Sequence, residues 1–238
     1  MLIPLTAFCV LAVLGSGATA SAATANCGSH GHYFDGYGDW SSGYIGTSAT
    51  IVVRNSPLCS TDTNPESNFS FTWVMIADND GSSGYAQSGY FHGYGTPIRL
   101  AVEDSPSGTT FRRTYVGTAT VGAAYDFSVQ SGSGTNCPSV VTHCELEMID
   151  GVIYQSTGFD PAKRWTAPFS NEWLGETTWT NSDISGTSAN KSAFTNLDVE
   201  DTIDGFIGHA YTNGSASPVN PRGQRSAWSS TSFSIWSS

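Results

Sequence analysis

The most constraining feature of the sequence is a nearly continuous run of apolar and aromatic residues, Phe69–Ala77. The run has the length of a strand, and its lack of alternation indicates a strand that is covered on both faces. A turn-rich stretch, 78–84, follows it, and Tyr85–Phe91 then has the composition of a partner strand. We therefore predict a hairpin whose first strand lies in the interior of a sheet.

Further strand-length segments follow at regular spacing, separated by turns rich in Gly and Ser, and no segment has a convincing amphipathic helix pattern. Only 161–164 resembles a single helical turn, whereas Asp150-Gly151 is a strong hairpin signal. The pattern predicts an all-β fold, an antiparallel two-sheet β-sandwich of jelly-roll or concanavalin-like type. The other predicted strands are Tyr44–Arg54, Ile98–Glu103, Thr114–Thr120, Tyr125–Gln130, Glu145–Asp150, Val152–Gln155, Ala193–Glu200, Phe206–Tyr211 and Ser232–Trp236.

Residues 1–25 have the features of an export signal, because an apolar run from Leu2 to Leu14 precedes small residues with A-x-A sites. The run is too short to cross a bilayer, and no later segment reaches the length of about 18 apolar residues that a membrane span needs. We expect a secreted protein whose residues 26–238 form a single β-sandwich domain, since no repeat or linker divides them.

The chain is poor in charge and acidic, with 12% charged residues and a formal net charge of −11. Phosphate backbones and anionic headgroups do not attract such a surface, so we expect no nucleic-acid partner and no membrane partner. Self-repulsion of the carboxylates would weaken at low pH, which makes an acidic working environment physically reasonable.

Four cysteines remain after the export signal: Cys27, Cys59, Cys137 and Cys144. An even number in an oxidising compartment indicates two disulfides, for which three pairings exist. We predict Cys27–Cys59, which would secure the N-terminal segment, and Cys137–Cys144, which closes a short loop.

A zinc site is the competing use of these cysteines, but the chain has no C-x-x-C pair. His30 and His32 alternate within a Gly- and aromatic-rich segment, 26–40, that we expect to be a wrapped loop or an edge segment. Two histidines without a third ligand nearby are more typical of surface positions than of a metal site. We expect neither a metal nor another cofactor.

Two carboxylates and two tryptophans crowd into the stretch Pro168–Trp179, PFSNEWLGETTW. Glu172 and Glu176 are four residues apart, so they would share one face of a strand or of a helix. The aromatic and β-branched residues, with Gly175 in the middle, favour the strand. Spacing alone also fits a solvated strand face without any chemistry.

The motifs of several other enzyme classes are missing from the sequence. There is no G-x-S-x-G, no H-E-x-x-H, no P-loop and no dinucleotide-binding fingerprint, and the cysteines are predicted to be paired. Carboxylate and amide side chains remain as the candidates for chemistry.

Two motifs, in this order, resemble those of the glutamic peptidases, a group with two branches, the fungal eqolisins and the neprosin-like enzymes. The first is Trp73–Ile76 (WVMI) followed by Gln87–Gly89 (QSG), which is similar to the W-V-x-I strand and the Q-x-G of eqolisins. The second is Glu172–Glu176 (EWLGE), which resembles E-W-I-V-E and E-W-G-G-E in the two branches. The chain departs from the group at Tyr90–Pro97, where a segment rich in tryptophan and tyrosine is expected.

The resemblance implies a secreted endopeptidase that hydrolyses peptide bonds at acidic pH with a Gln/Glu dyad. Gln87 would hold the attacking water and donate a hydrogen bond to the oxyanion, and a glutamate would act as general base and then as general acid. We expect Glu176 to be that glutamate, because Gly175 beside it would permit close approach of the substrate. Glu172 is the reserve candidate.

The expected partner is a protein or peptide substrate, bound by a monomer. Aromatic residues near the two motifs would line the cleft, namely Trp73, Tyr85, Tyr90, Trp173 and Trp179. A non-catalytic sandwich that binds polysaccharide or a cell-wall surface through such aromatic residues is the alternative reading. A glycosidase is disfavoured, because acids four apart on one strand lie about 13 Å from each other, farther than either glycosidase geometry needs.

Overall fold

The computed structural model describes residues 25–78, 84–105, 110–137, 143–157, 169–201, 205–208 and 219–238. Within these ranges the regular structure is β-strand apart from one 3₁₀ turn, η1 (Gly134–Asn136). Residues 1–24 of the predicted export signal and the helical turn expected at 161–164 lie outside the described residues. Among the described residues, no helix is long and apolar enough to cross a membrane.

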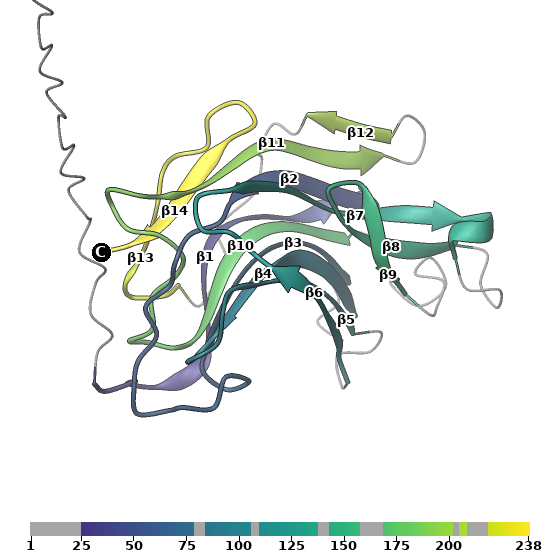
Figure 1. The fold of residues 1–238 in the computed structure, drawn as a ribbon. Helices are drawn as coiled ribbons and strands as arrows, with labels where there is room; N and C mark the ends of the chain where they lie inside the picture. Colours follow the sequence, from purple (N-terminus) through teal and green to yellow (C-terminus); the bar gives the residue numbers. More distant parts are fainter. Residues whose placement is uncertain are drawn as a thin grey trace, which may run out of the picture.

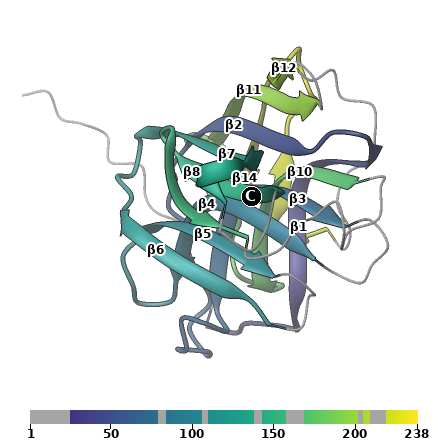
Figure 2. The same ribbon diagram turned by 90° about the vertical axis from the view of Figure 1, so that its right-hand side faces the viewer.

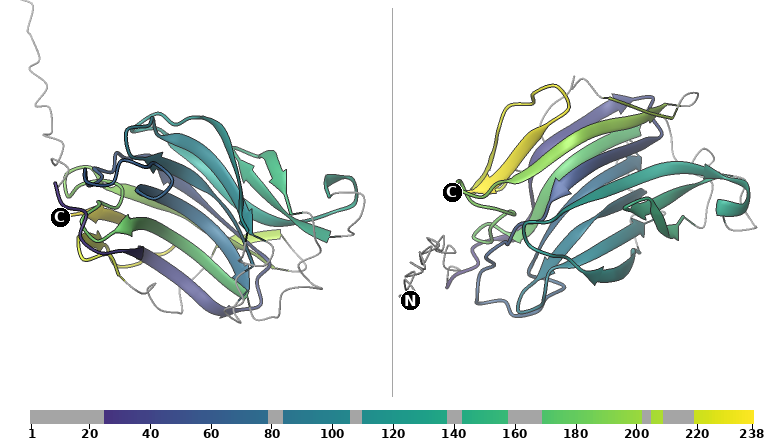
Figure 3. Two further views of the ribbon diagram at one scale, coloured as in Figure 1. Left: turned by 90° about the horizontal axis from the view of Figure 1, so that it is seen from below. Right: turned by 45° about the horizontal axis from the view of Figure 1, so that its top comes forward.

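The strands form two antiparallel sheets that pack face to face (Figures 1 and 2). The first sheet has six strands, which in spatial order are β1 (His30–Ser42), β10 (Phe169–Trp179), β3 (Phe69–Asp78), β4 (Tyr85–Gly93), β5 (Arg99–Ser105) and β6 (Arg112–Thr118). Figure 1 shows this sheet as an arch whose hollow side faces away from the second sheet. Figure 3 (left) views the hollow side, with β1 and β10 side by side.

The second sheet has eight strands and covers the convex side of the arch. Its members in spatial order are β13 (Gly223–Arg225), β14 (Phe233–Ser237), β11 (Ser192–Asp201), β2 (Gly46–Val52), β7 (Ala124–Ser133), β8 (His143–Ile149) and β9 (Val152–Ser156), and β12 (Gly205–Gly208) pairs with β11. The predicted antiparallel two-sheet β-sandwich is confirmed, and so is the β3–β4 hairpin in the interior of a sheet.

The main hydrophobic core lies between the sheets and is built by strand alternation. Trp173, Tyr90 and Val102 reach into it from the six-stranded sheet, and Phe127 and Phe194 meet them from the other. All five side chains are 1% exposed or less. Burying a large side chain of this kind contributes about 1.5–3 kcal/mol, so this layer fixes how the two sheets pack on each other.

The N-terminal segment that we expected to be a loop or an edge segment forms β1, an edge strand. It pairs with β10 over most of its length, with Phe34 opposite Glu176 and Gly38 opposite Glu172. Gly36 has a φ of 137°, and a Cβ there would lie 2.3 Å from the carbonyl oxygen of Trp173. Only glycine permits this close approach of the two strands.

Both predicted disulfides are present, Cys27–Cys59 and Cys137–Cys144. The first joins the segment before β1 to the long loop before β3, and the Cys27 N–H donates to Thr61 Oγ1 in the same loop. The second closes a short loop between β7 and β8. The predicted hairpin turn at Asp150-Gly151 also joins β8 to β9, with a positive φ at both residues.

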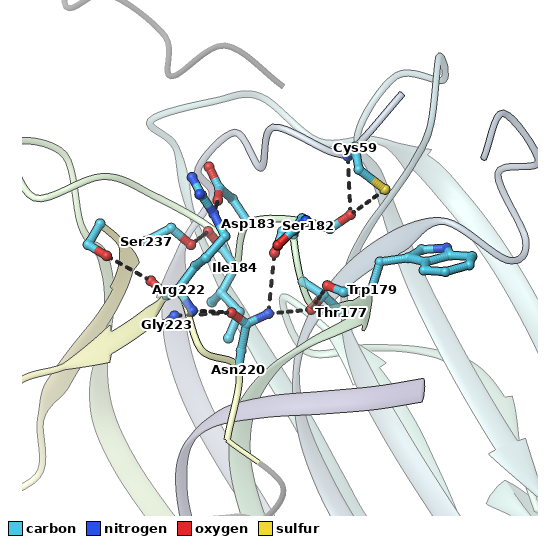
Figure 4. Close-up of polar contacts among 12 residues, drawn as sticks. Cys59, Thr177, Trp179, Ser182, Asp183, Ile184, Asn220, Arg222, Gly223 and Ser237 are labelled. Atoms are coloured by element: carbon cyan, nitrogen blue, oxygen red, sulfur yellow. Dashed lines mark hydrogen bonds and ion pairs between the residues drawn. The ribbon is translucent and has the colours of Figure 1, made fainter. Parts of the chain in front are cut away.

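A buried amide holds the C-terminal part of β10 in place (Figure 4). The Asn220 Nδ2 donates to Thr177 Oγ1 at 2.6 Å and to the Ser182 carbonyl at 3.2 Å. Its Oδ1 accepts from the N–H groups of Arg222 and Gly223, at 2.7 and 3.1 Å. Asn220 is 1% exposed, so water does not readily replace its side chain as the hydrogen-bond partner of these four groups.

We predict that Asn220→Ala lowers the free energy of unfolding by about 2–4 kcal/mol, because two donors and two acceptors lose their buried partner together. Chemical denaturation measures this loss. The matched control is Asn55→Ala, since Asn55 is exposed and accepts a hydrogen bond from the Gly186 N–H with its backbone carbonyl, which the substitution keeps. Equal stability of the two variants would contradict the role given to Asn220.

The interior between β8 and the first sheet also holds two carboxyl groups, Glu145 and Glu147, which are 3% and 0% exposed. Both Glu147 oxygens and the Glu145 Oε2 are buried without a hydrogen-bond partner. Burial raises the pKa of both groups well above the ordinary glutamate value, and nearby carboxylates, Glu200 for Glu145 and Asp104 for Glu147, add to the rise. The folded chain therefore favours the neutral acids.

We predict a protein that is more stable at pH 4–5 than at pH 8. A pKa raised in the folded state gives stability that is fully present below the unfolded value of about 4.3 and is lost as the pH rises through the folded value. Unfolding temperatures measured across this range test it. Glu147→Gln should reduce the fall of the unfolding temperature between pH 5 and pH 8, whereas Glu66→Gln, at an exposed carboxylate, should leave that fall unchanged. A wild-type protein that gains stability toward pH 8 would contradict the prediction.

Candidate active site

A cleft of about 610 Å³ lies on the hollow face of the six-stranded sheet. Strand alternation sends one set of side chains into it and the other set into the core. From β10, Glu172, Leu174 and Glu176 line the cleft, whereas Trp173 lies in the core. The expectation that the two glutamates share one face of a strand agrees with this geometry.

Gln87 and Glu172 lie at the same level of the sheet. Met75 on β3 is the register partner of Gln87 on β4 and also of Glu172 on β10. One strand therefore separates the two residues, and their Cα atoms are about 10 Å apart. Glu176 is four residues farther along β10, about 16 Å from Gln87 by the same reckoning. The register favours Glu172 as the partner of Gln87.

The Q-x-G pattern has a packing reason. A Cβ at Gly89 would lie 2.1 Å from the Thr72 carbonyl oxygen and 2.8 Å from the Trp73 Cα. Glycine at this position lets β4 pair closely with β3, and that pairing brings Gln87 level with Met75.

The carboxyl group of Glu172 is nearly enclosed, with 9% of the residue exposed. Ser170 Oγ donates a hydrogen bond to it, and the Trp40 side chain is a second partner. Burial raises the pKa of Glu172 to about 7, against the opposing effect of these hydrogen bonds. Below neutral pH this carboxyl is therefore a neutral acid inside the cleft.

Glu176 is in a different setting, in contact with the His32 Nδ1 from β1. The hydrogen bond and the charge of Glu176 raise the pKa of His32, against the smaller effect of burial. The His32 side chain is 63% exposed, so this ion pair sits at the rim of the cleft and in contact with solvent. Surface pairs of this kind contribute little to stability.

Gln87 is hydrogen-bonded on the side away from Met75. Its Nε2 donates to Glu103 Oε1 at 3.1 Å, and Tyr85 O–H donates to the same oxygen at 2.6 Å. Arg113 Nε donates to the other oxygen of Glu103. Burial raises the pKa of Glu103, whereas Arg113 and Tyr85 oppose that rise.

Much of the remaining lining of the cleft is aromatic. Trp73 and Tyr85, two of the predicted substrate-binding residues, line it, together with Phe34, Trp40, Phe69, Phe71 and Phe111. An extended apolar wall beside a polar centre is the usual composition of a site for an organic ligand. Among the described residues, no group of three or more His, Cys, Asp and Glu side chains could hold a metal ion.

Comparison of the sequence with known proteins finds no match: no protein family and no curated protein is recognisably similar to it. Solved structures, in contrast, include similar ones. A crystal structure of scytalido-glutamic peptidase with a transition-state analogue inhibitor matches with a TM-score of 0.59 and 14% identity, and covers 88% of this chain and 100% of its own. SCP-B, a member of the eqolisin family of peptidases solved with the tripeptide Ala-Ile-His, matches with a TM-score of 0.56 and 12% identity, and it also covers 88% of this chain and 100% of its own.

The chain has the fold of the glutamic peptidases. The resemblance read from the two short motifs is thereby supported by the whole architecture. At 12–14% identity the likeness concerns the fold alone and assigns no role to any residue of the site.

Three of the predicted substrate-binding residues do not line the cleft. Tyr90 and Trp173 are on the opposite face of their strands, in the core, where the Tyr90 hydroxyl contacts Ser192 Oγ and the Trp173 Nε1 donates to the Ser48 carbonyl. Trp179 ends β10 outside the lining of the cleft, with its Nε1 donating to Asp62 Oδ2 and its ring against His30. Alternation explains the first two. On β4, Gln87 faces the cleft and Tyr90, three residues on, faces the core; on β10, Glu172 faces the cleft and its neighbour Trp173 faces the core.

The role expected for Gly175, close approach of the substrate beside Glu176, is wrong. Gly175 does not face the substrate side, because a Cβ there would lie 2.6 Å from Ile235 Cδ1 and 2.8 Å from Ile184 Cγ2 in the core. Glycine serves sheet packing at this position.

Sequence reasoning missed four residues of the cleft that bear on its chemistry: His32, Trp40, Glu103 and Arg113. Glu103 stands at the end of a predicted apolar strand in a chain with few charges, and that isolation was the available signal. His32 was interpreted as a surface residue, which its exposure supports, but its contact with Glu176 depends on the β1–β10 pairing.

We predict that the pKa of His32, followed by NMR titration of its ring protons, lies above the ordinary value of about 6.5 and falls toward it in Glu176→Gln. The cause is loss of the carboxylate partner. Glu172→Gln is the matched control, since Glu172 is no cause of the His32 shift. An unchanged titration in Glu176→Gln would show that the pair does not form in solution.

Proposed function

We propose that the protein is a secreted endopeptidase of the glutamic type, which hydrolyses peptide bonds at acidic pH with Gln87 and Glu172 as its dyad. The observation that carries the proposal is the common register of these residues on either side of Met75, in the floor of the cleft. The similar fold of peptidases solved with a transition-state analogue or a tripeptide supports a peptide as the ligand. The proposal includes a monomer without a cofactor.

The spacing suits one substrate group and one water molecule. Side chains that stand on the same face of a sheet with Cα atoms about 10 Å apart leave a gap in which a carbonyl and a water fit at hydrogen-bond distances. The Gln87 amide offers an acceptor for the water and a donor for the developing oxyanion. The enclosed position of Glu172 strengthens both kinds of interaction.

A neutral Glu172 carboxyl can serve both halves of the reaction. One of its oxygens accepts a proton from the attacking water, and its O–H gives a proton to the carbonyl oxygen, so that the carboxyl stays neutral while the tetrahedral intermediate forms. When the C–N bond breaks, the carboxyl donates a proton to the leaving amine and regains one from a hydroxyl of the intermediate. Atoms and charge balance in each step without a metal.

The acidic range follows from the same group. Glu172, whose pKa is about 7, is a neutral acid at pH 3–5, and the proton transfers to the carbonyl oxygen and to the leaving amine need this form. The predicted export, the net charge of −11 and the buried carboxyl groups of the interior are consistent with a protein that works outside the cell in acid.

We predict that the purified protein cleaves an unfolded protein substrate at pH 3–5, and that kcat/KM falls as the pH rises through about 7. Glu172→Gln should lower the rate about 10²–10⁴-fold and Gln87→Ala about 10²–10³-fold. Glu176→Gln, four residues along the same face, should retain most of the activity. Peptide release followed by mass spectrometry measures all four proteins, and circular dichroism checks that each is folded.

Three results would count against the proposal in different ways. Loss of activity in Glu176→Gln alone would return the role to Glu176. Activity confined to pH above 7 would mean that the Glu172 carboxylate acts as the base. No cleavage from pH 2 to 8 would favour a non-catalytic sandwich, whose aromatic cleft can be tested with polysaccharides by calorimetry.

A further inference from the structure

We infer that Glu103, held by Arg113, is a positioning residue that fixes which way the Gln87 side-chain amide faces. The orientation of the amide follows from hydrogen bonds alone, whereas its use in catalysis rests on the proposed function. The side chains that set this orientation form a row across β4, β5 and β6.

Three neighbouring strands bring the relevant groups to one level. Gln87 on β4 pairs with Glu103 on β5, and Glu103 pairs with Arg113 on β6. All three side chains line the same cleft. Gln87 and Glu103 are each 4% exposed, and the Arg113 side chain is 8% exposed, so water does not compete freely for their hydrogen bonds.

Glu103 receives hydrogen bonds from every side. Its Oε1 accepts from Gln87 Nε2 at 3.1 Å and from Tyr85 O–H at 2.6 Å, and its Oε2 accepts from Arg113 Nε at 2.5 Å. Because Oε1 already accepts the Tyr85 O–H, it offers Gln87 an acceptor and no proton. Gln87 must therefore turn its NH₂ group toward Glu103, which turns its Oε1 away.

Arg113 makes this arrangement rigid. Its guanidinium lies 4.3 Å from the ring centre of Phe91, 5.5 Å from that of Phe69 and 5.6 Å from that of Phe71. A cation buried against aromatic rings needs a close counter-charge, and Glu103 is the buried one, because Glu66, which also contacts Arg113, is 55% exposed. Arg113 thus holds Glu103 in place and opposes the rise of its pKa that burial causes.

The fixed orientation has a chemical consequence for Gln87. An amide that could rotate by 180° about its last bond would present NH₂ and carbonyl oxygen to the cleft in turn. With Nε2 tied to Glu103, the Oε1 is always the group that accepts a hydrogen bond from water, and the second N–H keeps one direction for an oxyanion. Glu103 acts through Gln87, without touching the substrate.

The neighbouring residue provides a matched control. Asp104 follows Glu103 on β5 and is also a buried carboxylate paired with an arginine of β6, since Arg112 Nη2 donates to Asp104 Oδ2 at 2.6 Å, although the Arg112 side chain is 55% exposed. Alternation turns this pair to the opposite face of the sheet, where the Arg112 side chain donates to Asp104 and to the Ser156 carbonyl. Asp104→Asn therefore removes a buried carboxylate and its pairing with an arginine without changing the setting of Gln87.

The test compares the wild-type protein, Glu103→Gln and Asp104→Asn by NMR of the Gln87 side-chain amide. In the wild type one Nε2 proton should be shifted downfield and should exchange with solvent more slowly than the other. Glu103→Gln, which can offer either an acceptor or a donor, should remove this difference, whereas Asp104→Asn should preserve it. Equal exchange of the two protons in the wild type would overturn the inference even if Glu103→Gln does not fold.

Kinetics give a second readout. Glu103→Gln should lower kcat about 10–100-fold with little change in KM, while Asp104→Asn keeps the wild-type kcat at a temperature where it is folded. A loss of kcat that is equal in both variants would reduce Glu103 to a structural role and overturn the inference. If the wild-type protein has no peptidase activity but the amide protons behave as stated, the proposed function fails and the positioning role of Glu103 stands.

Discussion

The alternation of side chains along the strands of the six-stranded sheet is the constraint on which the rest of the structure depends. Each of these strands lies between the hydrophobic core and the cleft, so successive residues alternate between the two. A shift of one residue in the pairing of β10 with β3 would exchange Glu172 with Trp173. The burial of Trp173, which is 0% exposed, therefore also sets the position of the candidate catalytic acid.

Local patterns in the sequence were sufficient to predict the class of fold and much of its detail. The apolar run of β3, the Asp150-Gly151 turn and the even number of cysteines each specify structure within a few residues or by simple counting. The common face of Glu172 and Glu176 also follows from a period of two. Residues an odd number of positions apart on a strand lie on opposite faces, which applies to Tyr85 and Tyr90 and to Glu172 and Trp173. Assigning all four to one cleft was therefore inconsistent with a strand.

Register between strands could not be predicted from the sequence. Whether Gln87 meets Glu172 or Glu176 depends on β10 and β4 each pairing with β3, and these strands are brought together from distant parts of the chain. No local signal measures such a pairing, and the pairing of β1 with β10 that brings His32 to Glu176 has the same origin. The contact of Glu103 with Gln87 comes from a hairpin, where a register could have been attempted from the predicted strands.

The Cys27–Cys59 bridge has a consequence for a protein that is proposed to cut other proteins. Edge strands and long loops are where a peptidase finds extended, accessible chain, and β1 and the loop before β3 are of these two kinds. The bridge joins them, and residues 27–59 form a covalent ring. A single cut within that ring leaves both pieces attached, so the wall of the cleft formed by β1 can outlast an attack by another copy of the same enzyme.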